Sequence, residues 1–171
     1  MGLRSRARQA HVQFLELHDV SDEVLSQLYE VEVQAHVSPW DKDDIISLVA
    51  LPHNHCIGLY CEERLVGFAL ISVVAGEAEL YTIGILPKYQ GLGFGHQLLH
   101  STLARAVELG AEACFLEVRV SNEVAIHLYD FYGFQIEGVR KNYYAATETT
   151  PAEDAYLMKA DLTALPDAPL H

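Results

Sequence analysis

The segment Gln90-Gly91-Leu92-Gly93-Phe94-Gly95 separates two regular patterns in the sequence. The run from Glu77 to Leu86 before it is typical of a β-strand, which Pro87 ends. After the glycines, apolar residues recur on one helical face until Gly110. The backbone N–H groups and the dipole at such a helix start can bind a pyrophosphate group, although the same glycines also fit an ordinary strand-to-helix turn.

Helix and strand patterns continue on both sides of this loop. On its N-terminal side we expect a strand at 12–17, a helix whose apolar face carries Leu25, Leu28, Tyr29 and Val33, a shorter helix at 41–51, and strands at 56–61 and 65–74. On its C-terminal side we expect a strand at 114–120, a helix at 122–132 that Gly133 ends, and strands at 134–139 and 155–159. An antiparallel meander followed by a crossover helix predicts an α/β fold.

Length and composition indicate one domain, because 171 residues, half of them apolar, can bury a sizeable core. We expect this domain at 12–161, with flexible segments at 1–11 and 162–171, since both ends lack a periodic apolar pattern. No run approaches the roughly 20 apolar residues that span a membrane, and no signal peptide is visible. The sequence therefore predicts a soluble, cytoplasmic protein that does not act at a membrane.

The net charge and the cysteine content argue against several classes of function. The net charge of −13 argues against direct binding of nucleic acid and suits a basic partner, although acidity can also serve solubility alone. The three cysteines form no Cys-x-x-Cys pair, which argues against a disulfide framework and against a structural zinc site. His96 and His100 have a metal-binding spacing on the predicted helix, but no third ligand accompanies them, so we expect no metal.

The spacing of the glycines excludes two nucleotide-binding motifs. The loop lacks the Gly-Lys-Ser/Thr of a P-loop, and it differs from the Gly-x-Gly-x-x-Gly of dinucleotide-binding folds. Gln90-x-x-Gly93-x-Gly95 instead resembles the Gln/Arg-x-x-Gly-x-Gly/Ala loop of the GNAT N-acetyltransferases. The resemblance implies acetyl-CoA as cosubstrate and the α/β fold of that family, a mixed, mostly antiparallel sheet of six to seven strands flanked by about four helices.

The same resemblance implies which residues hold acetyl-CoA. The pyrophosphate would contact Gln90, Gly91, Leu92, Gly93, Phe94, Gly95 and His96, and the pantetheine arm would pair with the backbone of Ile83, Gly84 and Ile85. Gly84 suits this arrangement because a missing side chain permits close approach, with a β-bulge as the alternative explanation. Most relatives carry arginine where this chain has Gly91 and His96. We therefore expect backbone amides to bind the anion and a protonated His96 to add attraction.

A second set of motifs narrows the resemblance to one subfamily. These motifs are 116–122, 125–129 and 132–134, with supporting pieces at Ala35-His36, Pro39-Trp40, 140–144 and 153–155. Together they cover nearly all of residues 12–160 and are similar to the ribosomal-protein-alanine N-acetyltransferases. The resemblance implies a basic acceptor, the N-terminal alanine of small-subunit ribosomal protein 18.

Attack of an amine on a thioester needs a proton acceptor for the amine and a proton donor for the departing thiolate. The resemblance assigns Glu117 as the base and Tyr129 as the acid, and leaves Tyr132 to packing. A Glu117 that faces solvent or pairs with Arg119 is the alternative. Asn122 lies two helical turns before Tyr129 and would contact the coenzyme arm, although capping its helix is an equally simple role. The candidate acceptor-binding residues are Trp40, Arg119, Tyr143 and Tyr144.

Two other functions fit parts of the sequence. The acceptor could be a lysine side chain, a polyamine or an aminoglycoside, although an amine of higher pKa demands more of the base. The chain could instead be a non-catalytic acyl-CoA-binding module, against which the presence of Glu117 and Tyr129 argues. No nucleophile is evident, so direct transfer without an acyl-enzyme is the simpler mechanism.

Overall fold

The computed structural model describes residues 11–166, and these residues form one seven-stranded sheet. The strand order is β1-β2-β3-β4-β5-β7-β6, and neighbouring strands are antiparallel except for the parallel pair β4 and β5. The predicted flexible segments include residues 1–10 and 167–171, which lie outside the described part of the chain.

The elements follow the order that the sequence predicts. The strands are β1 (Val12–Leu17), β2 (Asn54–Cys61), β3 (Arg64–Val74), β4 (Glu77–Ile85), β5 (Ala113–Arg119), β6 (Gln135–Tyr144) and β7 (Glu153–Asp161). Between and after them lie α2 (Asp22–Ala35), α3 (Lys42–Ala50), η1 (Pro87–Tyr89), α4 (Phe94–Glu108), α5 (Glu123–Phe131) and η2 (Leu162–Ala164), where η denotes a 3-10 helix. The predicted mixed, mostly antiparallel sheet with four α-helices is confirmed within residues 11–166.

Polar caps explain where the helices begin. The Ser21 side chain accepts a hydrogen bond from the backbone N–H of Val24, and Asp41 does the same for Asp44. Each cap satisfies a backbone donor that has no partner inside the helix, which is worth about 1 kcal/mol. Local sequence therefore sets the starts of α2 and α3.

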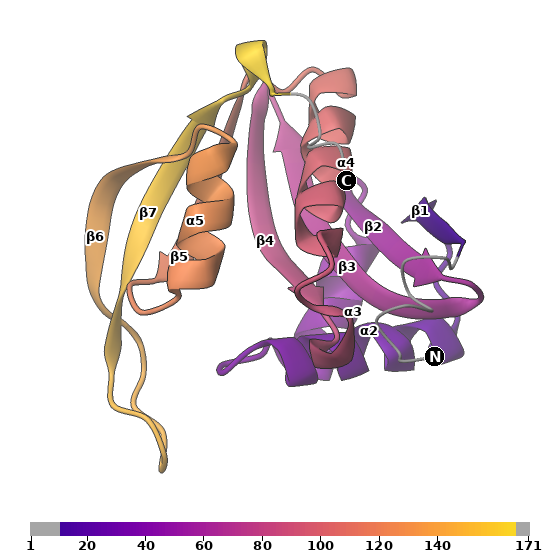
Figure 1. Cartoon of the computed structure of the whole chain (residues 1–171), viewed down its shortest axis with the longest axis horizontal. Coiled ribbons are helices and arrows are strands. Elements are labelled where there is room, and N and C mark those ends of the chain that lie inside the picture. The colour runs from indigo at the N-terminus through magenta and orange to yellow at the C-terminus, as the bar shows by residue number, and fades with distance from the viewer. Residues whose placement is uncertain (1–10, 167–171) are drawn as a thin grey trace.

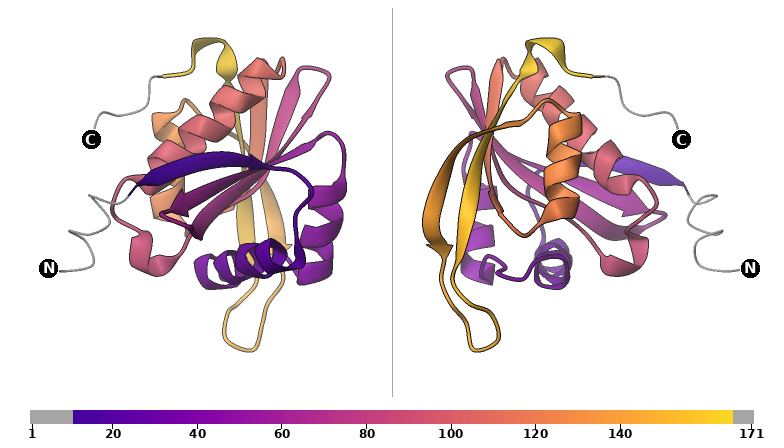
Figure 2. Two further views of the ribbon diagram at one scale, coloured as in Figure 1. Left: turned by 90° about the vertical axis from the view of Figure 1, so that its right-hand side faces the viewer. Right: turned by 60° about the vertical axis from the view of Figure 1, so that its left-hand side comes forward.

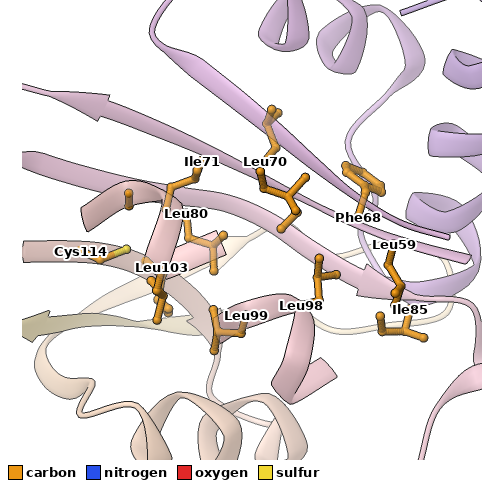
Figure 3. Close-up of a cluster of buried hydrophobic side chains, with 14 of the residues drawn as sticks. Leu59, Phe68, Leu70, Ile71, Leu80, Ile85, Leu98, Leu99, Leu103 and Cys114 are labelled. Carbon is orange, nitrogen blue, oxygen red and sulfur yellow. The ribbon is translucent and has the colours of Figure 1, made fainter. Parts of the chain in front are cut away.

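The helices cover both faces of the sheet. Helices α2 and α3 pack on one face, and α4 and α5 lie on the other (Figures 1 and 2). Figure 3 shows part of the apolar core, with labelled side chains from α4 (Leu98, Leu99, Leu103) and from the sheet (Leu59, Phe68, Leu70, Ile71, Leu80, Ile85, Cys114). The amphipathic pattern that predicted α4 is thus the pattern that buries it.

The two parallel strands separate halfway along their length. β4 pairs with β5 only where Glu77–Leu80 faces Ala113–Leu116, although both strands continue further. Tyr81 forms a bulge, because Leu70 pairs with Thr82 while Ile71 pairs with Leu80. From the bulge onward, the edge of β4 that faced β5 carries no strand, and the two strands diverge in Figure 1. The separated ends of β4 and β5 form a wedge.

The structure differs from the sequence prediction near the C-terminus. β6 runs on to Tyr144 rather than ending at 139, and β7 begins at Glu153. Leu162 was expected in the flexible tail, but it is buried at the start of η2, so the packed chain continues past residue 161. The reason is that Leu162 joins the apolar core. None of the helices within residues 11–166 is long and apolar enough to cross a membrane.

Candidate active site

Two adjoining cavities open at the wedge between β4 and β5. The first has a volume of about 400 Å³ and the second of about 370 Å³. Of the predicted site residues, the first is lined by Trp40, Ile83, Glu117, Arg119, Asn122, Tyr129 and Tyr144. The second is lined by Trp40, Glu117, Tyr143 and Tyr144, together with Asp44 and Glu79. Both predicted proton carriers therefore lie on the wall of one cavity.

Glu117 lies on β5 and lines both cavities. Its Oε1 atom is 2.8 Å from Nε of Arg140 on β6, and its side chain is 22% exposed. It also accepts a hydrogen bond from the Tyr143 phenol; that bond and burial raise the pKa of Tyr143 to about 12. The alternative that Glu117 pairs with Arg119 is wrong, because Arg119 pairs with Glu153.

Tyr129 reaches the first cavity from α5. Its side chain is 6% exposed, and its ring packs on Phe134 with the ring centroids 5.6 Å apart. Burial raises the pKa of Tyr129 well above its usual value of 10, so the phenol keeps its proton at neutral pH. Tyr132 has the packing role that the sequence predicts, since it is buried and its hydroxyl donates to the carbonyl oxygen of His96 at 2.9 Å.

Arg119 is held by protein groups on three sides. Its Nη1 is 2.9 Å from Oε2 of Glu153, its Nη2 donates to the Ser38 hydroxyl, and its guanidinium carbon lies 4.0 Å from the centre of the Tyr144 ring. Hydrogen bonds from Ser121 and Arg119 lower the pKa of Glu153. The predicted role of Arg119 in acceptor binding stays a prediction. The observed contacts hold its side chain in the wall of the first cavity.

The glycine loop has a conformation that needs glycine. Gly91 and Gly93 have φ angles of 74° and 85°, in the left-handed region that favours glycine, and Gly93 is the N-cap of α4. The Gln90 amide donates to the carbonyl oxygen of Ile85 at 2.9 Å, which braces the loop against the end of β4. The first backbone N–H groups of α4 have no acceptor within the helix and can bind an anion.

The His96 ring is directed toward α5. Its centroid lies 5.1 Å from that of Phe131 and 5.9 Å from that of Tyr132. The expected attraction between a protonated His96 and a pyrophosphate stays a prediction. Within residues 11–166, no group of three or more His, Cys, Asp or Glu side chains could hold a metal ion.

Gly84 is needed for a contact that we did not expect. A Cβ atom at this position would lie 2.9 Å from Cβ of Ala35 and 3.2 Å from Nε2 of His36, so the end of α2 closes over it. The bulge in β4 is at Tyr81 rather than at Gly84. The opposite edge of β4 pairs with β3 over residues 83–85, which leaves the edge on the wedge side for another partner.

Asn122 caps α5 at the rim of the first cavity. Its Oδ1 accepts a hydrogen bond from the backbone N–H of Ala125 at 3.2 Å. The capping role is confirmed, and contact with the coenzyme arm stays a prediction.

A buried polar cluster in the same cavity wall was missed by sequence reasoning. The Glu32 side chain is fully buried and accepts a hydrogen bond from the Thr82 hydroxyl at 2.5 Å. Nε2 of His36 lies 3.4 Å from the Glu32 carboxylate and 3.1 Å from the Thr82 hydroxyl. Burial raises the pKa of Glu32 to about 7. The signal was available, because Leu25, Leu28 and Glu32 share one face of the predicted helix, where a glutamate is out of place.

Comparisons with known proteins agree with this geometry. The model of the acetyltransferase (GNAT) family matches residues 25–134. The [ribosomal protein bS18]-alanine N-acetyltransferase of Haemophilus influenzae is 41% identical over 123 residues, which cover 69% of this chain and 80% of that protein. N-alpha-acetyltransferase RimI of Mycobacterium tuberculosis is 38% identical over 138 residues, which cover 77% of this chain and 83% of that protein. The crystal structure of the ribosomal-protein-S18-alanine N-acetyltransferase from Escherichia coli has a TM-score of 0.81 at 29% identity and covers 94% of this chain and 100% of that chain.

Proposed function

This chain belongs to the GNAT family and is an acetyl-CoA-dependent N-acetyltransferase, and we propose that its acceptor is the N-terminal alanine of ribosomal protein bS18. The main structural support for the proposal is the position of Glu117, which lines both cavities. One cavity lies in the wedge where an acyl donor fits, and the other provides a separate entrance for an amine. The names of the related proteins supply the identity of the acceptor.

The wedge fits the pantetheine arm of acetyl-CoA. The arm carries amide groups, and β5 no longer covers the edge of β4 beyond Tyr81, so this edge is available to pair with them. We assign this pairing to Ile83, Gly84 and Ile85, and the pyrophosphate to the loop from Gln90 to His96. The left-handed glycines of the loop support this assignment, because they leave the amides at the start of α4 accessible.

Glu117 and Tyr129 then carry the protons of the transfer. The carboxylate of Glu117 takes a proton from the ammonium group, and the free amine attacks the thioester carbonyl carbon. An N–C bond forms as the C–S bond breaks, Tyr129 protonates the leaving thiolate, and the second proton lost by the nitrogen restores the Tyr129 phenol. Tyr129 suits this role because its raised pKa keeps it protonated. An α-amine titrates near pH 8, so a carboxylate is a sufficient base.

The second cavity suits a peptide that carries positive charge. Trp40, Tyr143 and Tyr144 provide its aromatic walls, and Asp44 and Glu79 add carboxylates beside Glu117. Burial and the charge of Glu117 raise the pKa of Glu79. A cationic acceptor would relieve this repulsion between carboxylates, which agrees with the net charge of −13.

The direct test is release of free thiol from acetyl-CoA with a short peptide that begins Ala-Arg. We expect rapid release with the free α-amine and none with the same peptide blocked at its N-terminus. Rapid turnover of a blocked peptide with an internal lysine would contradict the proposed acceptor.

Two variants test the assigned proton carriers. Glu117→Gln and Tyr129→Phe should each lower kcat by about 10²-fold to 10⁴-fold. Glu137→Gln is the matched control for Glu117→Gln, because Glu137 is exposed on β6. A loss below threefold in Glu117→Gln or Tyr129→Phe would refute the role of that residue.

A further inference from the structure

The buried cluster of Glu32, His36 and Thr82 is not used by the proposed chemistry, yet all three residues line the first cavity. Glu32 has no solvent exposure, and the Thr82 hydroxyl donates to its Oε1 at 2.5 Å. His36 closes the cluster toward the cavity, with its Nε2 3.1 Å from the same hydroxyl. The cluster therefore joins α2 to β4 through side chains at the cavity wall.

Thr82 is the first residue of β4 beyond the bulge. It pairs with Leu70 of β3 on one side, and β5 no longer pairs with it on the other. Its side chain reaches across to α2 instead. Two residues further, Gly84 lies against Ala35 at the end of the same helix. The separated half of β4 thus contacts α2 where β5 no longer pairs with it, while it remains paired with β3.

A purely structural contact would not require a carboxylate at this position. Glu32 lies on the apolar face of α2 beside Leu28 and Val31, which are both fully buried. A leucine would continue that face without removing an ionisable group from water, which is unfavourable unless hydrogen bonds compensate. What a leucine could not do is accept the hydrogen bond from Thr82, which links α2 to β4 beside the cavity.

We propose that Glu32 is a positioning residue for the acyl donor, acting through Thr82 to hold the free edge of β4 where the pantetheine arm can pair with it. The proposal rests on the assignment of the arm to β4 made above. The role of Glu32 does not depend on which amine is acetylated, so it can be tested by measuring coenzyme binding in the absence of any acceptor.

Substitutions of Thr82 can either remove or keep its hydrogen bond to Glu32. Thr82→Val keeps the shape of the side chain and removes the hydroxyl, whereas Thr82→Ser keeps the hydroxyl. Loss of a buried hydrogen bond corresponds to roughly a tenfold change in affinity. We expect Thr82→Val to weaken binding of CoA by about tenfold or more, and Thr82→Ser to bind CoA within about threefold of the wild type.

The matched control is Thr102→Val. Thr102 is a fully buried threonine whose hydroxyl donates to the carbonyl oxygen of Leu98 at 2.7 Å, within α4 and outside both cavities. Its loss should leave the affinity for CoA unchanged. If Thr82→Val does not fold, Glu32→Leu takes its place, since it removes the acceptor of the same bond.

The affinity of each folded variant for CoA is measured by isothermal titration calorimetry. Steady-state kinetics with acetyl-CoA and the Ala-Arg peptide then give the KM for each substrate. The proposal expects weaker CoA binding and a higher KM for acetyl-CoA, with the KM for peptide changed less than twofold. CoA binding by Thr82→Val within twofold of wild type, or no rescue by Thr82→Ser, would overturn it. Failure of the peptide as an acceptor would count against the proposed function alone, because the titration needs no acceptor.

Discussion

Replacing Glu32 by Gln should make the stability of the protein less dependent on pH. In the folded protein burial raises the pKa of Glu32 from 4.5 to about 7. Between these pH values the folded state holds a proton that the unfolded chain has lost, so the free energy of unfolding falls as pH rises through this window. Above about pH 7 the whole cost of ionising Glu32 in its buried site is present.

The size of the effect follows from the same two pKa values. The difference between 4.5 and about 7 corresponds to about 3 kcal/mol as an upper value. Gln is neutral at every pH and keeps an oxygen that can accept from Thr82. Glu32→Gln should therefore match the wild type near pH 4.5 and exceed its stability at pH 8 by up to about 3 kcal/mol.

The assay is urea unfolding of both proteins at pH 4.5, 6 and 8, followed by circular dichroism. Burial also lowers the pKa of His36, whose Nε2 lies 3.4 Å from the Glu32 carboxylate, so the same comparison is repeated in a His36→Gln background. Glu137→Gln serves as the control for removal of an exposed carboxylate. A stability difference that changes by less than about 1 kcal/mol between pH 4.5 and 8 would refute the argument from burial.

Three further substitutions test the packing around the cavities. Gly84→Ala places a methyl group 2.9 Å from Cβ of Ala35 and should destabilise the fold by about 1–3 kcal/mol, seen as a lower melting temperature; an unchanged melting temperature would contradict this contact. Arg119→Lys keeps the charge but loses the planar contacts, including the bond to Ser38, and should raise the KM for peptide several-fold; a rise in the KM for acetyl-CoA alone would argue against this role. Asn122→Ser retains a capping side chain and should preserve the melting temperature; weaker CoA binding would then reveal contact with the arm, and unchanged binding would leave capping as its role.

Local patterns predicted most elements because their signals are local. Hydrophobic periodicity, capping residues and the breakers Pro87 and Gly110 identified α4 and its flanking strands to within a few residues. The end of β6 was missed because residues 140–144 show no alternation of apolar and polar side chains. Contacts with Asp154 on β7 hold that stretch, through the backbone of Asn142 and the side chain of Lys141.

Only part of the candidate site could be predicted from the sequence. Motifs shared with a known family placed Glu117, Tyr129 and Tyr144 together, and the structure brings all three to one cavity. No spacing rule could pair Glu117 with Arg140 or Glu32 with Thr82, because these partners lie on different elements that only packing brings into contact.

The sequence by itself determined the succession of strands and helices and the glycine loop at the start of α4, because backbone preference and hydrophobic periodicity act over a few neighbouring residues. Only the tertiary structure decided that β4 separates from β5 after Leu80, that Arg119 pairs with Glu153, and that a buried glutamate on α2 accepts a hydrogen bond from the separated part of β4. These features depend on burial and on hydrogen bonds between residues far apart in the chain. Their physical cause is the packing of α2 and β5 around β4, and this packing cannot be recognised from a short stretch of sequence.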